Sequence, residues 1–202
     1  MPERGTDLPT IMDPSFSEAW TQLRADDPAM TEDAFAGRLE LIYRELNRAW
    51  NAQDLAAVRG FVSDGLFDYL GYWIQAYRAQ GLRNAVDGAR LVRWEPVKLG
   101  RDAHYDALTV RLFATGKDYT VDANDRVVGG SKHADRDYSE YWTLIRGAAV
   151  RGAPKAERAC PNCGAELRVA MSGQCAYCHV RVTAGGFDWV LSKIEQDDSY
   201  AG

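Results

Sequence analysis

The chain has 202 residues and a net charge of −5, with 46% hydrophobic and 11% aromatic residues. This length supports one well-buried domain and a small module, whereas two full-sized domains would be cramped. An acidic chain is a poor general binder of nucleic acid, and no apolar run reaches the length of a membrane span. The N-terminus lacks the apolar core of a signal peptide, so we expect a soluble, cytoplasmic protein that does not bind nucleic acid.

Residues 1–30 are polar, with scattered apolar side chains such as Trp20 and Leu23. We expect a loose N-terminal arm with about one helical turn. From Thr31 the pattern becomes helical, because apolar residues recur at spacings of three or four and charged residues such as Arg38 fall on the other face. The apolar positions of this long helix are Phe35, Leu39, Ile42, Leu46 and Trp50.

A short helix is expected after Asp54, and a third helix should run from the cap Ser63 to Gly81, a residue that suits a helix C-terminus. The apolar face of the third helix is wide and comprises Leu66, Phe67, Leu70, Trp73, Ile74 and Tyr77. The helical spacing of its aliphatic residues favours packing against a sheet, although such a face also suits a ligand pocket or a membrane surface.

After Asn84 the sequence period changes from that of a helix to that of strands. Alternation predicts strands around residues 92–97, 108–112, 138–146 and 187–194. Turn residues occur at 116–118 and 124–125, and we expect a loop from Val127 to Asp135. Helices followed by antiparallel strands predict an α+β fold, with one helical layer on a sheet face.

All four cysteines belong to two Cys-x-x-Cys pairs, formed by Cys160, Cys163, Cys175 and Cys178. Four thiolates at this spacing can surround one tetrahedral zinc ion, and the pattern is typical of a zinc ribbon. Disulfides, a redox dithiol or a rubredoxin-type iron site are the alternatives, and the adjacent His179 is an alternative ligand. Four sulfurs leave no open position on the metal, so we expect a structural site in a reducing compartment.

The cysteine module lies between the last two predicted strands and replaces the hairpin turn if those strands pair. We therefore divide the chain into an arm at residues 1–30 and an α+β domain at 31–202, which the ribbon interrupts at 151–183. The ribbon has a small excess of basic residues, but a zinc ion bound by four thiolates carries a charge of about −2 that offsets most of it. This balance also argues against nucleic-acid binding.

Several segments, in this order, resemble the bacterial Tim44-like family, named after a scaffold subunit of the mitochondrial inner-membrane import motor. They are Glu45–Leu55, Val58–Leu66, Tyr141–Arg146 and Phe187–Leu191. The resemblance extends over roughly Asp27 to Tyr200 and includes the zinc ribbon before the last strand. It implies the cone-shaped nuclear-transport-factor-two-like fold, with a curved sheet closed by helices over an apolar pocket. It also implies a scaffold or membrane-associated role, peripheral at the inner membrane, with a protein or an anionic lipid as partner.

Cone-shaped folds of this type also include small isomerases and cyclases, so an enzyme is the main alternative, and a ribbon-mediated nucleic-acid-associated protein is another. An enzyme needs an acid–base pair inside the cone. None of the three histidines, His104, His133 and His179, lies in an alternating strand. Asp106 and Glu140 are candidate buried carboxylates, although a strand carboxylate usually faces solvent.

The aromatic residues of the third helix and of the strands are the candidate pocket residues. We expect them to line or cap an apolar cavity large enough for an acyl chain or a partner's hydrophobic segment. These candidates are Phe67, Trp73, Tyr77, Trp94, Phe113, Trp142 and Trp189. The alternative is that they fill the cone completely, in which case the binding surface lies elsewhere, most plausibly on the ribbon.

Overall fold

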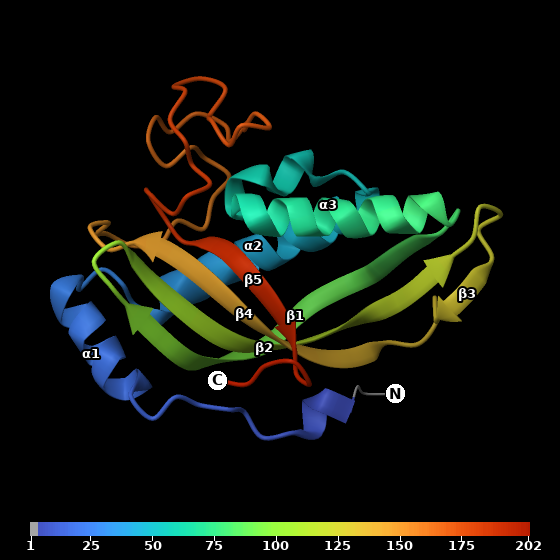
Figure 1. The fold of residues 1–202 in the computed structure, drawn as a ribbon, viewed down its shortest axis with the longest axis horizontal. Helices are drawn as coiled ribbons and strands as arrows, with labels where there is room; N and C mark the ends of the chain where they lie inside the picture. Colours follow the sequence, from blue (N-terminus) through green and yellow to red (C-terminus); the bar gives the residue numbers. More distant parts are fainter. Residues whose placement is uncertain (1–3) are drawn as a thin grey trace.

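The computed structural model describes residues 4–202, with side chains from residue 6 onward, and shows helices packed on an antiparallel sheet (Figure 1). The helical elements are η1 (Arg4–Asp7), α1 (Phe16–Asp26), α2 (Glu32–Ala52), η2 (Leu55–Phe61) and α3 (Asp64–Ala79). The strands are β1 (Arg83–Arg101), β2 (Tyr105–Val121), β3 (Val127–Gly130), β4 (Arg136–Gly147) and β5 (Val190–Gln196). They pair in the order β1-β2-β4-β5, and β3 pairs with β2. The α+β fold with helices on a curved antiparallel sheet is confirmed.

The two long helices begin and end where the sequence predicts. Thr31 caps α2 by accepting a 3.2 Å hydrogen bond from the Ala34 amide, and Ser63 caps α3 by accepting one of 3.3 Å from Leu66. The chain leaves α3 through Gly81, whose φ of 66° lies in the left-handed region that glycine enters without strain. These caps satisfy amides that a helix leaves unpaired at its first turn.

The main core lies between the helical layer and one face of the sheet. Phe35 of α2 is fully buried, with ring centroids 5.4 Å from Trp94 and 5.7 Å from Trp189. Trp142 on β4 stands opposite Val110 of β2 and Ile194 of β5, so three strands contribute to one apolar layer. Each large side chain buried this way contributes about 1.5–3 kcal/mol before entropy is subtracted.

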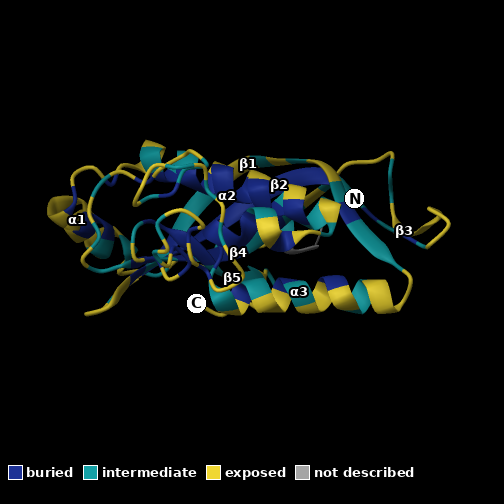
Figure 2. Cartoon of the chain, turned by 90° about the horizontal axis from the view of Figure 1, so that it is seen from above, coloured by how far each residue is buried: buried dark blue, intermediate teal, exposed yellow. Residues whose placement is uncertain are grey.

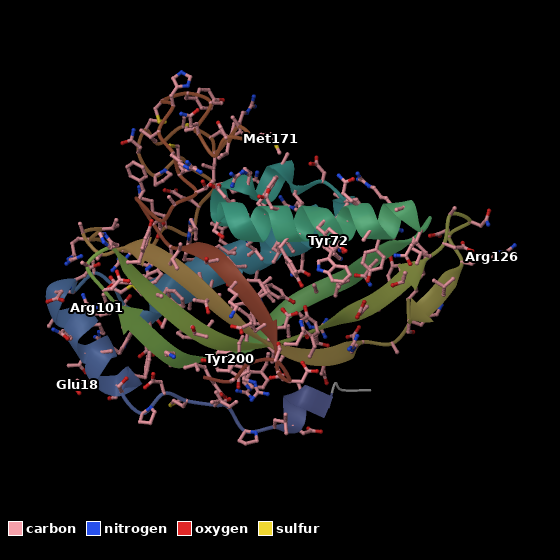
Figure 3. The ribbon with its side chains drawn as sticks, in the orientation of Figure 1. Glu18, Tyr72, Arg101, Arg126, Met171 and Tyr200 are labelled. Carbon is pink, nitrogen blue, oxygen red and sulfur yellow. The ribbon has the colours of Figure 1, made fainter. Side chains whose placement is uncertain are left out.

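The other face of the sheet is covered by the two ends of the chain (Figure 1). The Arg111 side chain is buried here, 2.8 Å from the carbonyl oxygen of Leu8 and 2.9 Å from an Asp197 carboxylate oxygen. Tyr200, labelled in Figure 3, stacks on Tyr141 with centroids 3.9 Å apart. The two ends of the chain therefore supply polar partners for Arg111 and cover Tyr141, so these charged and aromatic side chains of the sheet are shielded from solvent.

Three local expectations were wrong, each because a tertiary contact overrides a local signal. The single turn expected before residue 30 is the helix α1, since Trp20 and Leu23 give it a buried face. Gly116 lies inside β2 rather than in a turn: a Cβ there would be 2.9 Å from Val86, where the bulged β1 comes close. Part of the loop expected from Val127 forms β3, which pairs with β2 through Gly130.

The cysteine-rich insert joins β4 and β5, which pair as neighbours, so it occupies the position of a hairpin turn as predicted. It forms the loops that rise beside α2 and the start of α3 in Figure 1. The domain boundaries at residues 30, 151 and 183 stay predictions. None of the helices in residues 4–202 combines the length and the apolar composition that crossing a bilayer needs.

Candidate functional site

The two Cys-x-x-Cys pairs fold into two knuckles with the same backbone hydrogen bonds. In the first, the Cys160 amide donates to the Ala165 carbonyl at 2.7 Å and the Gly164 amide donates to Cys160 at 2.9 Å. The second repeats this at 2.9 and 3.0 Å, with Cys175 accepting from His179. The residue after each second cysteine is left-handed, with φ of 73° at Gly164 and 61° at His179. The repeated geometry turns both pairs of sulfurs toward one point.

The four sulfurs lie within 4.8 Å of one another. Across the two knuckles, the Sγ atoms of Cys160 and Cys178 are 3.8 Å apart, and those of Cys163 and Cys175 are 4.0 Å apart. A tetrahedral ion with Zn–S bonds of about 2.3 Å has sulfur–sulfur edges of about 3.8 Å, whereas a disulfide is about 2.05 Å long. The arrangement therefore fits a metal bound by four thiolates and does not fit two disulfides.

Neighbouring donors stabilise the thiolate form at Cys178, whereas at Cys163 the lowering effect of the Ala165 amide is outweighed by desolvation and the other three sulfurs, which raise the pKa to about 11. The backbone amide of Val180, and then the side-chain amide of Asn162 at 3.5 Å, lower the pKa of Cys178 to about 6. The amide of Tyr177 donates to the Cys175 sulfur at 3.4 Å. Among the described residues, the group of side chains placed to hold a metal ion consists of the four cysteines, and His179 instead serves the backbone turn.

The insert is attached to the helical layer by polar and apolar contacts. Arg158 forms an ion pair with Glu45, a residue of α2 that is only 1% exposed. Leu167 packs so closely on Gly60 of η2 that a Cβ at Gly60 would lie 2.7 Å from its Cδ2 atom. Arg59 donates to the Met171 carbonyl at 3.2 Å, and Met171 lies near the N-terminal end of α3 in Figure 3. The insert thus holds η2 and the start of α3 in place.

One side chain of α2 in this region, Arg38, departs from the expected solvent-facing pattern. Arg38 is buried and donates to the Trp189 carbonyl at 2.7 and 3.0 Å, so its expected place on the polar face was wrong. Burial lowers the pKa of Arg38, and Asp188 at 3.7 Å opposes that effect. Both residues fix the chain where it enters β5.

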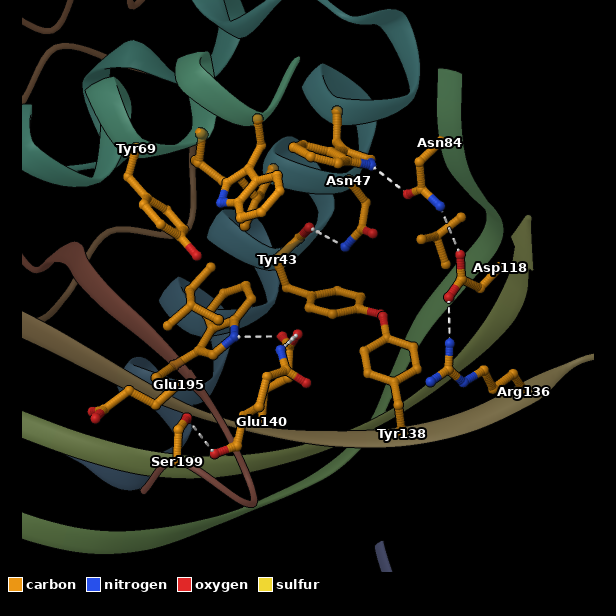
Figure 4. Close-up of a pocket in the computed structure, with 18 residues that line it drawn as sticks. Tyr43, Asn47, Tyr69, Asn84, Asp118, Arg136, Tyr138, Glu140, Glu195 and Ser199 are labelled. Carbon is orange, nitrogen blue, oxygen red and sulfur yellow. Dashed lines mark hydrogen bonds and ion pairs between the residues drawn. The ribbon is translucent and has the colours of Figure 1, made fainter. Parts of the chain in front are cut away.

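A second candidate site is a cavity of about 410 Å³ between α3, α2 and the sheet (Figure 4). Its apolar lining comprises Leu46, Trp50, Leu70, Trp73, Val86, Trp142 and Ile194. Its polar lining comprises Tyr43, Asn47, Tyr69, Asn84, Asp118, Arg136, Tyr138, Glu140, Glu195, Gln196 and Ser199. The cavity is therefore aromatic and aliphatic on one part of its wall and strongly polar on another.

Two of the aromatic residues predicted for a pocket, Trp73 and Trp142, line this cavity together. The structure places the other five, Phe67, Tyr77, Trp94, Phe113 and Trp189, outside its lining. Of these, Trp189 and Trp94 contact Phe35 in the closed core, and Tyr77 contacts Trp50 edge to face with centroids 6.3 Å apart. Phe67 lies under the Arg59 guanidinium at 4.7 Å, and Phe113 contacts Arg93 and Arg111.

The polar wall is organised by hydrogen bonds between adjacent elements. Glu140 accepts from the Trp142 indole and from the Gln196 amide, each at 2.9 Å. The hydroxyls of Tyr43 and Tyr138 are 2.6 Å apart, and burial raises the pKa of Tyr43 to about 12. These contacts fix the positions of the polar groups before any ligand binds.

Another chain of contacts follows the sheet edge of the cavity. Trp50 donates to Asn84 at 2.9 Å, Asn84 donates to Asp118 at 3.0 Å, and Arg136 forms an ion pair with Asp118 at 2.6 Å. Figure 4 shows this chain running from α2 across β1 and β2 to β4. The only cation of the described lining is therefore held at one end of the cavity by a carboxylate.

Sequence reasoning missed most of the polar lining, although a signal for part of it was present. Tyr138, Glu140 and Trp142 alternate along β4 and so share one face of the sheet. Tyr43 and Asn47 are one helical turn apart on α2. Of the two carboxylates considered for an enzyme, Glu140 lies in the cavity, whereas Asp106 is buried at a different site beside Arg101, at 2.9 Å.

Comparison with family models finds a match to the Tim44-like domain over residues 16–155. The matched region extends from α1 through β4 and ends before the first cysteine. A comparison with curated protein sequences found no match.

Proposed function

The chain belongs to the Tim44-like domain family, and on that basis we propose that it is a non-catalytic binding module that holds its ligand in the cavity between α3 and the sheet. The observation that carries the proposal is the cavity of about 410 Å³, which combines an aromatic and aliphatic wall with fixed polar groups. Binding sites for small ligands and for inserted side chains have this composition.

The chemistry of the lining supports binding over catalysis. No histidine lines the cavity within the described part of the chain. The pKa of Tyr43, about 12, keeps its phenol protonated at neutral pH, so it is a poor general base. Glu140 accepts hydrogen bonds on both carboxylate oxygens from groups of the protein itself, an arrangement suited to fixing a charge in position.

The exposed side of α3 supports a protein partner. Tyr69, Tyr72 and Trp73 are exposed there and contact one another, with centroids 6.2 Å apart for Tyr69 and Trp73 and 5.5 Å for Tyr72 and Trp73. In Figure 2, exposed residues, drawn in yellow, occur along the whole of this helix. Aromatic residues are enriched at protein interfaces, and α3 carries two aspartates against one arginine. That charge disfavours an anionic membrane, which attracts basic segments.

The cysteine cluster has a structural role in this proposal. We assign zinc to it, because four thiolates close the coordination sphere and leave no place for a reacting water. The metal orders a segment that has few apolar residues of its own, and that segment in turn braces η2 and α3 at one end of the cavity.

The proposal is tested by titrating the purified protein with Nile red, a neutral apolar probe, and following its fluorescence. Trp73→Ala should weaken probe binding about tenfold, because it removes part of the apolar wall. Tyr72→Ala, a change on the same helix outside the lining, should leave the affinity within about twofold. If the wild-type protein does not bind the probe, or both variants bind it equally, the cavity is not the binding site.

The choice of partner is tested by flotation with vesicles of neutral or anionic lipid. We expect the protein to remain unbound in both cases, because the exposed face of α3 is aromatic and mildly acidic. Salt-sensitive flotation with anionic vesicles would show that the partner is a membrane surface instead.

A further inference from the structure

We propose that the face of the sheet covered by the two ends of the chain carries a second binding site, which takes the carboxylate of a small monocarboxylic acid. The site is a groove of about 390 Å³ between this face and residues 199–202. Its volume lies within the range of small-molecule sites, about 300–1,000 Å³. Of the described residues, only Glu195 and Ser199 line both this groove and the cavity under α3. The inference therefore goes beyond the proposed function and does not depend on it.

The floor of the groove is a row of polar residues that crosses four strands. Lys98 of β1 pairs with Thr109 of β2, which in turn pairs with Thr143 of β4. Thr143 also pairs with Lys193 of β5, and all four residues line the groove. Because cross-strand neighbours lie about 5 Å apart, the row places two hydroxyls between two lysines.

The two threonines leave one hydroxyl proton to donate. Their Oγ1 atoms are 2.9 Å apart, so one hydroxyl donates to the other. Two hydroxyls carry two protons, and the bond between them uses one. Thr109 is only 5% exposed, so this remaining donor is suited to an acceptor that enters the groove.

Tyr200 supplies a second, independent observation. This residue lines the groove, is 8% exposed and stacks its ring on Tyr141 (Figure 3). Within the described part of the chain, its buried hydroxyl has no hydrogen-bond partner. Burial, and then Tyr141 and Glu195, raise the pKa of Tyr200, so the hydroxyl keeps its proton and can donate. Buried hydroxyls are nearly always hydrogen-bonded, so this one indicates an acceptor supplied by a bound molecule.

The charges around the row match a ligand with one negative charge. Lys193 lies 2.8 Å from Glu195, so these two charges compensate each other. Lys98 is half-buried and forms no ion pair with any described residue. The Asp13 carboxylate already accepts from the Ser15 amide and hydroxyl at 2.8 and 2.7 Å, and Lys98 is the weakest of the causes that shift its pKa. The groove therefore offers one ammonium group without a bonded counter-ion.

A carboxylate fits this set of donors better than a phosphate or a neutral group. A phosphate dianion would bring a second charge toward Glu195 and Asp13, with one unpaired ammonium to balance it. A neutral ligand would leave Lys98 without a counter-ion, and bonds to a charged acceptor are roughly twice as strong as neutral ones. The small residues Gly100, Ala107 and Ala201 leave room beside the donors for a short uncharged chain.

Three probes with the same propyl chain test the proposal by nuclear magnetic resonance titration of the full-length, metal-loaded protein: butyrate, butyramide and propyl phosphate. We expect butyrate to bind about tenfold more tightly than the other two, with the largest amide shifts around the row on β1, β2 and β4. Equal binding of butyrate and butyramide, tighter binding of propyl phosphate, or shifts confined to the cavity under α3 would overturn the inference. Absence of binding by all three would also overturn it. None of these results bears on the proposed function, which the Nile red titration tests separately.

Two variants test the donors individually. Lys98→Met removes the ammonium and keeps the length of the side chain, so butyrate affinity should fall about tenfold. Lys117→Met is the matched control, because Lys117 is a half-buried strand lysine outside the groove, and it should leave the affinity within about twofold. Tyr200→Phe removes only the hydroxyl and keeps the ring on Tyr141, so the affinity should fall about fivefold. If Lys98→Met loses its cooperative unfolding transition, Tyr200→Phe provides the test, and wild-type affinity in the folded variants would refute the site.

The source of the carboxylate is distinguished by a further probe, N-acetyl-glutamate amide, which represents an acidic side chain of a protein. We expect it to bind no more tightly than butyrate. Clearly tighter binding would assign the groove to an acidic protein segment and overturn the assignment to a small free acid.

Discussion

The ion pair between Arg158 and Glu45 should contribute measurably to the stability of the whole domain. Glu45 is 1% exposed and Arg158 is 34% exposed. Breaking a fully buried pair costs about 3–5 kcal/mol, and an exposed pair is worth about 0.2–1 kcal/mol. Arg48 remains 3.3 Å from Glu45 and compensates part of its charge. We therefore expect Arg158→Met to lower the free energy of unfolding by about 1–2 kcal/mol.

Urea unfolding of the metal-loaded protein, followed by far-ultraviolet circular dichroism, measures this loss. Arg168→Met is the matched control, because its ion pair with Glu166 is exposed on both sides and should cost less than about 0.5 kcal/mol. Combining Arg158→Met with Glu45→Gln in a double-mutant cycle should give a coupling of about 1 kcal/mol. If Arg158→Met costs no more than the control, the insert does not brace α2 and our account of its docking is wrong.

Three other outcomes are expected. Elemental analysis should find about one zinc per chain. Cys163→Ser should abolish stoichiometric zinc binding and leave most of the helical circular dichroism signal. Full zinc retention in this variant would contradict the four-thiolate site. Trp189→Ala, in the closed core, should lower the free energy of unfolding by about 3–5 kcal/mol. Trp73 is 41% exposed, so Trp73→Ala should lower it clearly less, and thermal unfolding measures the difference. Burial raises the pKa of Tyr43 from 10.0 to about 12. The contribution of Tyr43 to the free energy of unfolding should therefore be complete below pH 10 and should decline as the pH rises to 12. Tyr43→Phe should flatten that decline in urea midpoints, and an unchanged decline would count against the assignment.

The helices and the four-cysteine cluster could be predicted because their sequence signals are local. The apolar spacing of α2, the caps Thr31 and Ser63, and the glycine after α3 each act within a few residues of the chain. The two Cys-x-x-Cys pairs likewise specify their own turns. His179 is the exception. Its backbone is left-handed although it is not a glycine, so this conformation could be inferred only from the equivalent position of Gly164 in the first knuckle.

The features that escaped prediction depend on contacts between distant segments. Gly116 has the composition of a turn, yet it is needed where β1 approaches β2, and only the pairing of the two strands reveals that. Arg38 has the helical position of a solvent-facing residue, yet it donates to the carbonyl of Trp189, which comes more than one hundred residues later in the chain, just before β5. Periodicity assigns a face to each residue but does not show which faces another segment will cover.

The position of the cavity follows from a change of polarity along β4. Leu144 is buried among the core residues that α2 covers, so this end of the cone is filled, and Trp142 stands at the boundary between that core and the cavity. Two and four residues earlier on the same face, Glu140 and Tyr138 replace apolar side chains. This half-buried carboxylate and phenol need hydrogen-bond partners rather than close apolar packing, so the helical layer does not close tightly against them. Aromatic composition alone therefore does not locate this cavity, whereas the switch from apolar to polar residues on one strand face marks where the cone stays open.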